Sequence, residues 1–171
     1  MSEKDTTASP TPTPAPSPME LVLQFHHTYS VPIRPFSDPT LDYERMNMRM
    51  SLIAEEFAEL MGAVYGPRAR AIIEAATAEA VATDEGERDV IEAADALADL
   101  VYVVYGMAIE SGMNRDSVLA EVQASNLSKL MPDGSVKLRE DGKVLKGPNF
   151  FQPNIARGLG LESPTDGSDA D

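Results

Sequence analysis

Apolar residues recur at helical spacing through the middle of the chain. In one segment they follow each other in alternating steps of four and three residues: Met46, Met50, Ile53, Phe57, Leu60 and Val64. This repeat is typical of one face of an α-helix. It predicts a helix from about Thr40 to Tyr65, which the pair Gly66-Pro67 ends.

Other segments also carry helix signals. Ser17 followed by Pro18 is a common start, and the helix would continue to about Tyr29. The segment from 87 to 111 is apolar on nearly every side, so we expect it at the centre of the fold or in a subunit interface. The remaining helices are predicted over 67–81 and 114–129.

The two ends of the chain differ from its middle. Residues 1–17 alternate Pro with small polar residues, and residues 156–171 are rich in acids, so neither can bury enough apolar surface to order. Asp141-Gly142 lies between two short β-prone runs, which indicates a two-residue hairpin. The prediction is an all-α domain over 18–155, a four- to five-helix bundle with a short C-terminal β-hairpin, between two disordered tails.

Composition narrows the classes of protein. The 171 residues are 43% apolar, which is enough for one domain with a core. A net charge of −14 argues against binding a nucleic-acid polymer, which needs a basic surface. The chain has no cysteine, no apolar leader and no apolar run long enough to span a bilayer. We therefore expect a cytoplasmic protein with no membrane partner.

Three glutamates lie beside the apolar stripe of the 40–65 helix. Glu55, Glu56 and Glu59 cover an arc of roughly 100° on the helix, with Glu56 nearest to the stripe. Like charges at this spacing repel, yet no Lys or Arg occurs between Arg49 and Arg68. An ordinary solvated face would mix charges of both signs. We therefore predict that a cation from outside this segment binds to the cluster.

A second acidic cluster lies on the most apolar predicted helix. Glu92, Asp95 and Asp99 are three and four residues apart, so they share one face. Their neighbours are mostly Ala, Leu, Ile and Val, and no basic residue occurs between Arg88 and Arg115. Burying an unpaired carboxylate is costly, so we expect these groups to be paired, protonated or bound to metal.

Two acidic helices without basic neighbours indicate hard divalent cations, because Mg²⁺ and Mn²⁺ prefer oxygen ligands. We expect two or more ions per site, since paired metals can clamp a phosphoryl group during displacement. One alternative is an exposed, solubilising acidic stripe. Another is a di-iron bundle, which needs Glu-x-x-His on two helices, whereas His26 and His27 are adjacent on the first helix.

Together these motifs resemble a known superfamily. "EEFAE" (55–59) followed by "EAAD" (92–95) is similar to the E-E-x-x-E … E-x-x-D signature of the all-α nucleoside triphosphate pyrophosphohydrolases, which include MazG, dimeric dUTPases and phosphoribosyl-ATP pyrophosphohydrolase. "EAADALADLVYVVYG", "SNLSKL" and "EDGKVLKGPNF" resemble segments of its MazG-like and dUTPase-like members. The resemblance covers about residues 19–153 and implies a MazG-like bundle.

The resemblance implies that water attacks the α-phosphorus of a nucleoside triphosphate, giving the monophosphate and pyrophosphate. It assigns the metal to Glu55, Glu56, Glu59, Glu92 and Asp95. Glu56 is also our candidate for orienting or deprotonating the water, because it flanks the core. Asp99 stays ambiguous, since "ADLVY" resembles the G-D-L-L-F stretch of MazG, in which the Asp is a ligand. In that register the partner position is Ala96, which cannot bind metal.

Basic residues concentrate late in the chain, where triphosphate charge could be met. The resemblance points to four residues as phosphate contacts: Asn126, Lys129, Lys143 and Lys146. A plain solvated basic patch is the alternative reading. Gln24, Phe25 and His27 could contact a base, but such residues more often belong to a core or a helix surface, so they stay outside the predicted site.

The leading hypothesis is a metal-dependent nucleotide pyrophosphohydrolase that prefers dUTP and removes noncanonical nucleotides, a preference that rests on the resemblance. The alternatives are a pyrophosphohydrolase of broader NTP or dNTP specificity and a non-catalytic helical module that binds metal or dimerises. The late basic segment favours the enzyme. The 87–111 helix carries more apolar surface than one short bundle can cover, so we expect a homodimer or a higher homo-oligomer.

Overall fold

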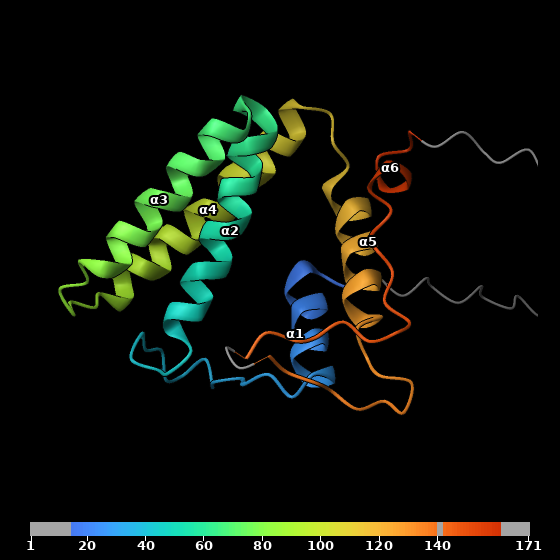
Figure 1. The fold of residues 1–171 in the computed structure, drawn as a ribbon, viewed down its shortest axis with the longest axis horizontal. Helices are drawn as coiled ribbons and strands as arrows, with labels where there is room; N and C mark the ends of the chain where they lie inside the picture. The colour runs from blue at the N-terminus through green and yellow to red at the C-terminus, as the bar shows by residue number, and fades with distance from the viewer. Residues whose placement is uncertain (1–14, 140–141, 162–171) are drawn as a thin grey trace, which may run out of the picture. The chain divides into compact units, whose positions relative to one another are not determined.

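The computed structural model describes residues 15–139 and 142–161 (Figure 1). These residues form six α-helices and contain no β-strand. None of the helices in the described part combines the length and apolar character needed to cross a membrane. The helices are α1 (Pro18–Thr28), α2 (Met46–Tyr65), α3 (Pro67–Ala82), α4 (Val90–Glu110), α5 (Arg115–Leu127) and α6 (Ile155–Gly158).

The described chain divides into two compact units. The first unit contains α1, α5 and α6, together with the segments up to residue 32, from 114 to 137 and from 144 onward. The second unit contains α2, α3 and α4 over residues 33–113, together with the described part of 138–143. All five predicted acidic ligands belong to the second unit.

In the first unit, α1 packs against α5. The hydroxyl of Ser17 accepts the backbone N–H of Glu20 and the Glu20 carboxylate accepts the N–H of Ser17, so the predicted start of α1 is confirmed as a capping box. Tyr29, directly after α1, is 2% exposed. Its hydroxyl donates to the carbonyl oxygens of Asn126 at 2.7 Å and Leu127 at 3.0 Å, and these bonds tie α1 to the end of α5.

The short helix α6 packs along α5 in the same unit. Arg157 of α6 donates through two nitrogens to the two carboxylate oxygens of Glu121, each at 2.7 Å. Ser125 is buried, and its hydroxyl donates to the carbonyl of Phe151 at 2.7 Å. Polar contacts therefore hold the C-terminal segment on α5, and the described structure continues past the predicted domain end at residue 155.

In the second unit, α2 and α3 form an antiparallel helical hairpin with Gly66 as its connection (Figure 1). Gly66 has φ +94°, a conformation that L side chains rarely adopt, and Pro67 begins α3 with a ring suited to the first helical turn. The Cβ of Arg70 on α3 would lie 3.1 Å from a Cβ placed at Gly62 on α2. This small residue lets the two helices approach closely, and Ala58, which is 1% exposed, lies at the same contact face of α2.

The third helix of this unit, α4, begins with a side-chain cap. The Asp89 carboxylate accepts the backbone N–H groups of Ile91 at 2.9 Å and Glu92 at 3.0 Å. Before it, Arg88 and Asp84 form an ion pair of 2.7 Å across the loop. No other described helix packs extensively along α4, and its large apolar side chains stay exposed.

Three details differ from the prediction. Helix α2 begins at Met46 instead of Thr40, because the Thr40 hydroxyl accepts the N–H of Asp42 in a turn. The sixth helix, α6, was not predicted. The hairpin is not confirmed: residues 140–141 lie outside the described residues, and the flanking segments share backbone hydrogen bonds without forming a strand, such as Arg139 N–H to the Lys143 carbonyl at 2.8 Å.

The predicted core face of α2 is also corrected. Five side chains of the stripe are between 38% and 52% exposed: Met50, Ile53, Phe57, Leu60 and Val64. The α2–α3 contact instead uses the face that carries Ala58 and Gly62. The helical period of the sequence was right, but it did not reveal that α3 covers a different face.

Candidate functional site

The acidic cluster of α2 is solvent-exposed. Glu55, Glu56 and Glu59 all lie on exposed parts of the helix, within one and a half turns of each other. Exposure lets each carboxylate change rotamer at low cost. The three groups are thus available to an incoming cation or to a partner from another segment.

Glu55 has such a partner in Lys143, 88 residues further along the chain. The Lys143 ammonium lies 3.0 Å from Oε2 of Glu55, and both side chains are a little under half exposed. Lys143 was predicted as a phosphate contact. In the structure Lys143 instead pairs with Glu55, a predicted metal ligand, so its ammonium neutralises part of the negative charge of the cluster.

Glu59 also meets a cation, which the sequence analysis missed. The guanidinium of Arg70 on α3 lies 3.3 Å from Oε1 of Glu59 and donates to Glu74 at 2.7 Å. These hydrogen bonds, chiefly the one to Glu74, raise the pKa of Arg70 further above its ordinary value. The signal was present in the sequence: in a helical hairpin that turns at Gly66, positions equally distant from the turn face each other, which places Arg70 opposite Gly62 and close to Glu59.

Glu56 differs from both neighbours. Within residues 15–139 and 142–161 no hydrogen bond or ion pair reaches its carboxylate. Glu56 is therefore the member of the cluster that has no competing cation in the described structure.

The acids of α4 are exposed as well. Glu92, Asp95 and Asp99 all lie on the open surface of the helix. The expectation that an apolar surround buries Glu92 and Asp95 is wrong for the described structure, because no other described helix packs extensively along α4. Solvation removes the burial penalty that the sequence argument relied on.

The described residues do not bring these acids into one cage. No three Asp, Glu or His side chains among them converge closely enough to hold a metal ion. The donor chemistry still suits Mg²⁺ or Mn²⁺, because every candidate ligand is a carboxylate and two of them already attract a cationic side chain. The chemistry of the residues fits the metal, whereas the convergence of α2 and α4 acids stays a prediction.

The first unit contains the predicted phosphate residues Asn126 and Lys129. The Lys129 ammonium lies 2.7 Å from Oδ1 of Asn126 and 5.9 Å from the centre of the Phe25 ring. Phe25 in turn contacts Tyr29, with ring centres 4.5 Å apart. The structure therefore brings Asn126 and Lys129 together beside an aromatic ring, within half-buried surroundings.

Lys146 belongs to a segment that is fastened to this same unit. Gly147, next to it, is buried and donates its N–H to the carbonyl of Lys129 at 3.0 Å. The Lys146 ammonium lies 4.4 Å from the centre of the Phe150 ring. Lys146 is exposed, so its charge is accessible to an anion.

Of the residues considered for base contact, Gln24 lies on α1. Its side-chain oxygen accepts the Gln123 amide at 3.1 Å, and Gln123 also donates to the carbonyl of Leu21 at 3.0 Å. Gln24 thus takes part in the contact between α1 and α5.

The described residues form an all-helical structure with an E-E-x-x-E motif on α2 and an E-x-x-D motif on α4, which is similar to the all-α nucleotide pyrophosphohydrolases. The model of the family described as phosphoribosyl-ATP pyrophosphohydrolase matches residues 22–126, which include all five predicted acidic ligands and Asn126. The chain belongs to this family.

A solved structure is consistent with that assignment. The chain is similar to a protein from Exiguobacterium sp. 255-15, to which NTP pyrophosphohydrolase activity is ascribed, at 27% identity and with a TM-score of 0.64. The match covers 84% of this chain and 94% of that one. No curated protein matches the chain significantly. The family and this structure support the activity of a hydrolase acting on nucleoside triphosphates.

Proposed function

We propose that the protein is a metal-dependent nucleoside triphosphate pyrophosphohydrolase whose preferred substrate is dUTP, which it converts to dUMP and pyrophosphate. The dUTP preference follows from the resemblance of "EAADALADLVYVVYG" and "EDGKVLKGPNF" to dUTPase-like members of the superfamily. Such an enzyme would remove a noncanonical nucleotide from the pool available to polymerases.

One observation supports this proposal above the others. The α2 segment matched by the family model carries three exposed carboxylates, of which two hold cationic side chains and the third, Glu56, holds none in the described structure. A solubilising stripe would have no need to attract Lys143 from 88 residues away. The arrangement suits a surface that attracts cations on both sides of Glu56 and leaves the Glu56 carboxylate able to act as a base.

In the proposed reaction, Glu56 orients the attacking water and takes its proton. The water oxygen forms a bond to the α-phosphorus, and the bond from that phosphorus to the oxygen bridging the α- and β-phosphates breaks. Pyrophosphate leaves with the bonding electron pair, and the nucleoside monophosphate remains. A positioned general base of this kind contributes about 10²–10⁴-fold to a rate.

Glu55, Glu56, Glu59, Glu92 and Asp95 are the proposed ligands of Mg²⁺ or Mn²⁺, with two or more ions expected. When bound, the metal neutralises charge on the phosphates and on the leaving group. Arg70 and Lys143 would have to release Glu59 and Glu55 as the ions enter. Both ion pairs are exposed, and exposed pairs are weak, so a divalent cation can replace them.

The proposed phosphate contacts are Asn126, Lys129, Lys143 and Lys146. An ammonium group serves as a point charge for phosphate, and the Asn126 amide can donate a hydrogen bond as well as accept one from Lys129. Once it leaves Glu55, Lys143 can contact the phosphate chain. These assignments rest on the resemblance and on the side-chain chemistry.

The family match favours a second candidate substrate, phosphoribosyl-ATP, which carries the same triphosphate chain. The two candidate substrates, dUTP and phosphoribosyl-ATP, differ in the group attached to the triphosphate and in the base. Their comparison therefore belongs in the first assay.

The decisive assay incubates the full chain with dUTP, the other common nucleoside triphosphates and phosphoribosyl-ATP, with Mg²⁺ or Mn²⁺, and measures pyrophosphate. We expect the highest kcat/KM for dUTP and no release after chelation. In ¹⁸O-labelled water, the label should appear in the monophosphate, because attack is at the α-phosphorus. Label in pyrophosphate or release of orthophosphate would refute this chemistry. If no nucleotide gave any product, the remaining hypothesis would be a non-catalytic module.

The role of Glu56 has its own test. Glu56→Gln should lower kcat by about 10²–10⁴-fold while leaving the helix content unchanged. Glu79→Gln on α3 is the matched control, since Glu79 is another exposed helical glutamate of the same unit. If Glu56→Gln kept full activity, the base would have to be another group.

A further inference from the structure

Two serine hydroxyls fasten a later segment of the chain to the end of α5. Ser125, in the last turn of the helix, donates to the carbonyl of Phe151 at 2.7 Å. Ser128, directly after the helix, accepts the N–H of the same Phe151 at 3.1 Å and donates to the carbonyl of Ser125 at 2.7 Å. The Phe151 side chain is 48% exposed, so polar contacts to its backbone hold this position more than apolar packing does.

The same segment is held at its other end. Gly147 donates its N–H to the carbonyl of Lys129 at 3.0 Å, and Phe150 donates its N–H to the carbonyl of Gly147 at 3.1 Å. Gly147 is buried, and a Cβ placed there would collide with the carbonyl of Leu130. Residues 147–151, which we call the GPNFF turn, therefore lie directly on the end of α5.

The GPNFF turn determines where Lys146 lies. The backbone of this lysine is fixed by the next residue, Gly147, and its ammonium lies 4.4 Å from the centre of the Phe150 ring, which belongs to the turn. On the α5 side, the Lys129 ammonium lies 2.7 Å from Oδ1 of Asn126. The bond from Gly147 to Lys129 thus joins the two segments that carry these lysines.

The charges of these segments favour an anion. The chain has 28 acidic residues, yet residues 122–132 and 142–160 contain no Asp or Glu and do contain the lysines. Within a protein of net charge −14, these two segments are locally positive. An anionic ligand is therefore attracted to the place where they meet.

The carbonyl groups at the end of α5 would oppose an anion, because a helix carries partial negative charge at its C-terminus. Donors from other segments cover them. The Tyr29 hydroxyl donates to the carbonyls of Asn126 and Leu127, and the Gly147 N–H donates to that of Lys129. These bonds reduce the repulsion that a phosphate group would meet beside the lysines.

We propose that Ser128 is a positioning residue for phosphate binding. By holding the GPNFF turn on the end of α5, its hydroxyl places the Lys146 ammonium beside Lys129, so that both charges meet one phosphate chain. The inference rests on the proposed function, in which the two lysines are phosphate contacts. The Ser128 hydroxyl already donates its one hydrogen and accepts another, so it acts through the turn without touching the phosphate.

The test uses inorganic tripolyphosphate, which has the phosphate chain without sugar or base. Its binding to the full chain is measured by calorimetry without divalent cations, so that no metal bound to the acidic cluster contributes. Lys146→Ala should raise the Kd by about 10-fold and Ser128→Ala by about 3–10-fold, because one ammonium is lost or displaced. Absence of binding to the parent chain, or an unchanged Kd in either variant, would overturn the proposal.

A double variant separates positioning from an independent contribution. If Ser128 acts through Lys146, the variant with both alanines should bind no more weakly than Lys146→Ala alone. Ser128→Thr retains the hydroxyl, so its Kd should stay within about 2-fold of the parent value. Losses that multiply in the double variant, or a threonine variant as weak as the alanine variant, would contradict the role of the hydroxyl.

Two controls exclude a general loosening of the fold. Glu121→Gln weakens the pair with Arg157, which is another fastening of the C-terminal segment to α5. Ser117→Ala changes an exposed serine in the first turn of the same helix. Both variants should keep the Kd of the parent, and urea denaturation measures their stability. Binding as weak in Glu121→Gln as in Ser128→Ala would assign the effect to stability and sink the proposal.

Nucleotide kinetics provide a further readout. Ser128→Ala should raise KM for the nucleotide and change kcat by less than about 3-fold, because the displaced lysine contributes to binding in the ground state as well as in the transition state. The tripolyphosphate experiments need no hydrolysis. An inactive protein with the expected binding pattern would refute the proposed function and leave this inference standing, whereas an active enzyme with multiplying losses would do the reverse.

Discussion

The two units of the molecule achieve stability by different means. In the first unit, Tyr29 and Ser125 are buried and each hydroxyl has a carbonyl partner within 3.0 Å. In the second unit, the described side chains meet mainly as exposed ion pairs, such as Arg70 with Glu59, around a single buried alanine. The buried hydroxyls of the first unit are satisfied internally, whereas the second unit leaves both charge and apolar surface facing outward.

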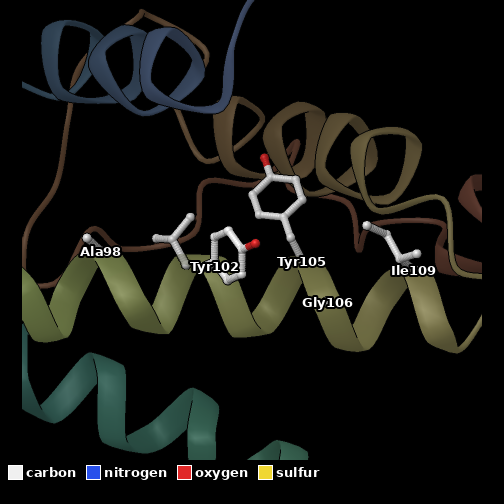
Figure 2. Close-up of a pocket in the computed structure, with 6 residues that line it drawn as sticks. Ala98, Tyr102, Tyr105, Gly106 and Ile109 are labelled. Carbon is white, nitrogen blue, oxygen red and sulfur yellow. The ribbon is translucent and has the colours of Figure 1, made fainter.

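This difference indicates where function lies. A surface that is already satisfied has little left to offer a ligand, while unpaired carboxylates and uncovered apolar side chains are open to cations and to another protein. The predicted acidic ligands and the exposed apolar side chains of α4, such as Tyr102 and Ile109 (Figure 2), both belong to the second unit. We therefore expect substitutions of the buried residues of the first unit to act chiefly on stability, whereas Asn126, Lys129 and Lys146 of that unit are proposed phosphate contacts. Substitutions of the acidic residues of the second unit should act on metal binding and catalysis.

The largest stability effect is expected from Gly147→Ala in the first unit. A Cβ at this position would lie 2.4 Å from the carbonyl oxygen of Leu130, which is backbone and cannot rotate away. The segment would have to move, at a cost of about 3 kcal/mol in the free energy of unfolding. Chemical denaturation followed by circular dichroism measures the change.

Gly106→Ala on α4 makes the matching substitution in the second unit. Its Cβ meets no atom within 4 Å, and alanine favours a helix, so the free energy of unfolding should change by less than about 1 kcal/mol. Equal losses for the two variants would contradict the contrast between a closely packed first unit and an open second unit.

A smaller effect is expected from Tyr29→Phe, which removes the donor to the Asn126 and Leu127 carbonyls. The loss should be about 1–2 kcal/mol, because two partly buried carbonyls lose that donor. Tyr65→Phe is the control, since Tyr65 is 72% exposed and its hydroxyl can be solvated. A loss as large in the Tyr65 variant would show that buried hydroxyl bonding is not the cause.

Tyr29 also makes the free energy of unfolding depend on pH. Burial raises the pKa of the Tyr29 hydroxyl above its ordinary value of 10.0. A pKa raised in the folded state means that this contribution to stability is complete below pH 10.0 and is lost as the pH rises through the higher folded value. The unfolding free energy of the parent should therefore fall more steeply above pH 10 than that of Tyr29→Phe.

The smallest stability effect is expected from Arg70→Gln, because its ion pairs are exposed. Its effect on metal binding should be larger than its effect on stability. Removing a cation that competes for Glu59 should tighten Mn²⁺ binding by about 3–10-fold, measured by calorimetry on the full chain. Arg88→Gln, which breaks the ion pair with Asp84, should leave the affinity nearly unchanged. Weaker binding in the Arg70 variant would mean that Arg70 orients Glu59 instead of competing for it.

Local sequence signals predicted most of the helices. Ser17 caps the start of α1, Gly66 lies between the end of α2 and the start of α3, and Asn114 caps the start of α5, so these boundaries could be predicted from nearby residues. The start of α2 could not, because Thr40 makes a turn that resembles a cap. The short α6 was missed because the long-range pair between Arg157 and Glu121 helps to hold it.

The sequence predicted which residue types make up the candidate site, but it did not predict which side chains contact each other there. The repulsion among the α2 glutamates indicated a missing cation, and the structure supplies Arg70 and Lys143 for two of them. Spacing along one helix does not reveal which face the next helix covers. For that reason the exposure of Phe57 and of the α4 acids could not be inferred before the packing was known.

The connection at Gly66 has a consequence for folding. The helices α2 and α3 are joined by one residue, so their contact closes a short loop and costs little chain entropy. Contacts this local in sequence form quickly, on the order of microseconds to milliseconds for helical proteins. The α2–α3 hairpin should therefore be an early intermediate of the nascent chain.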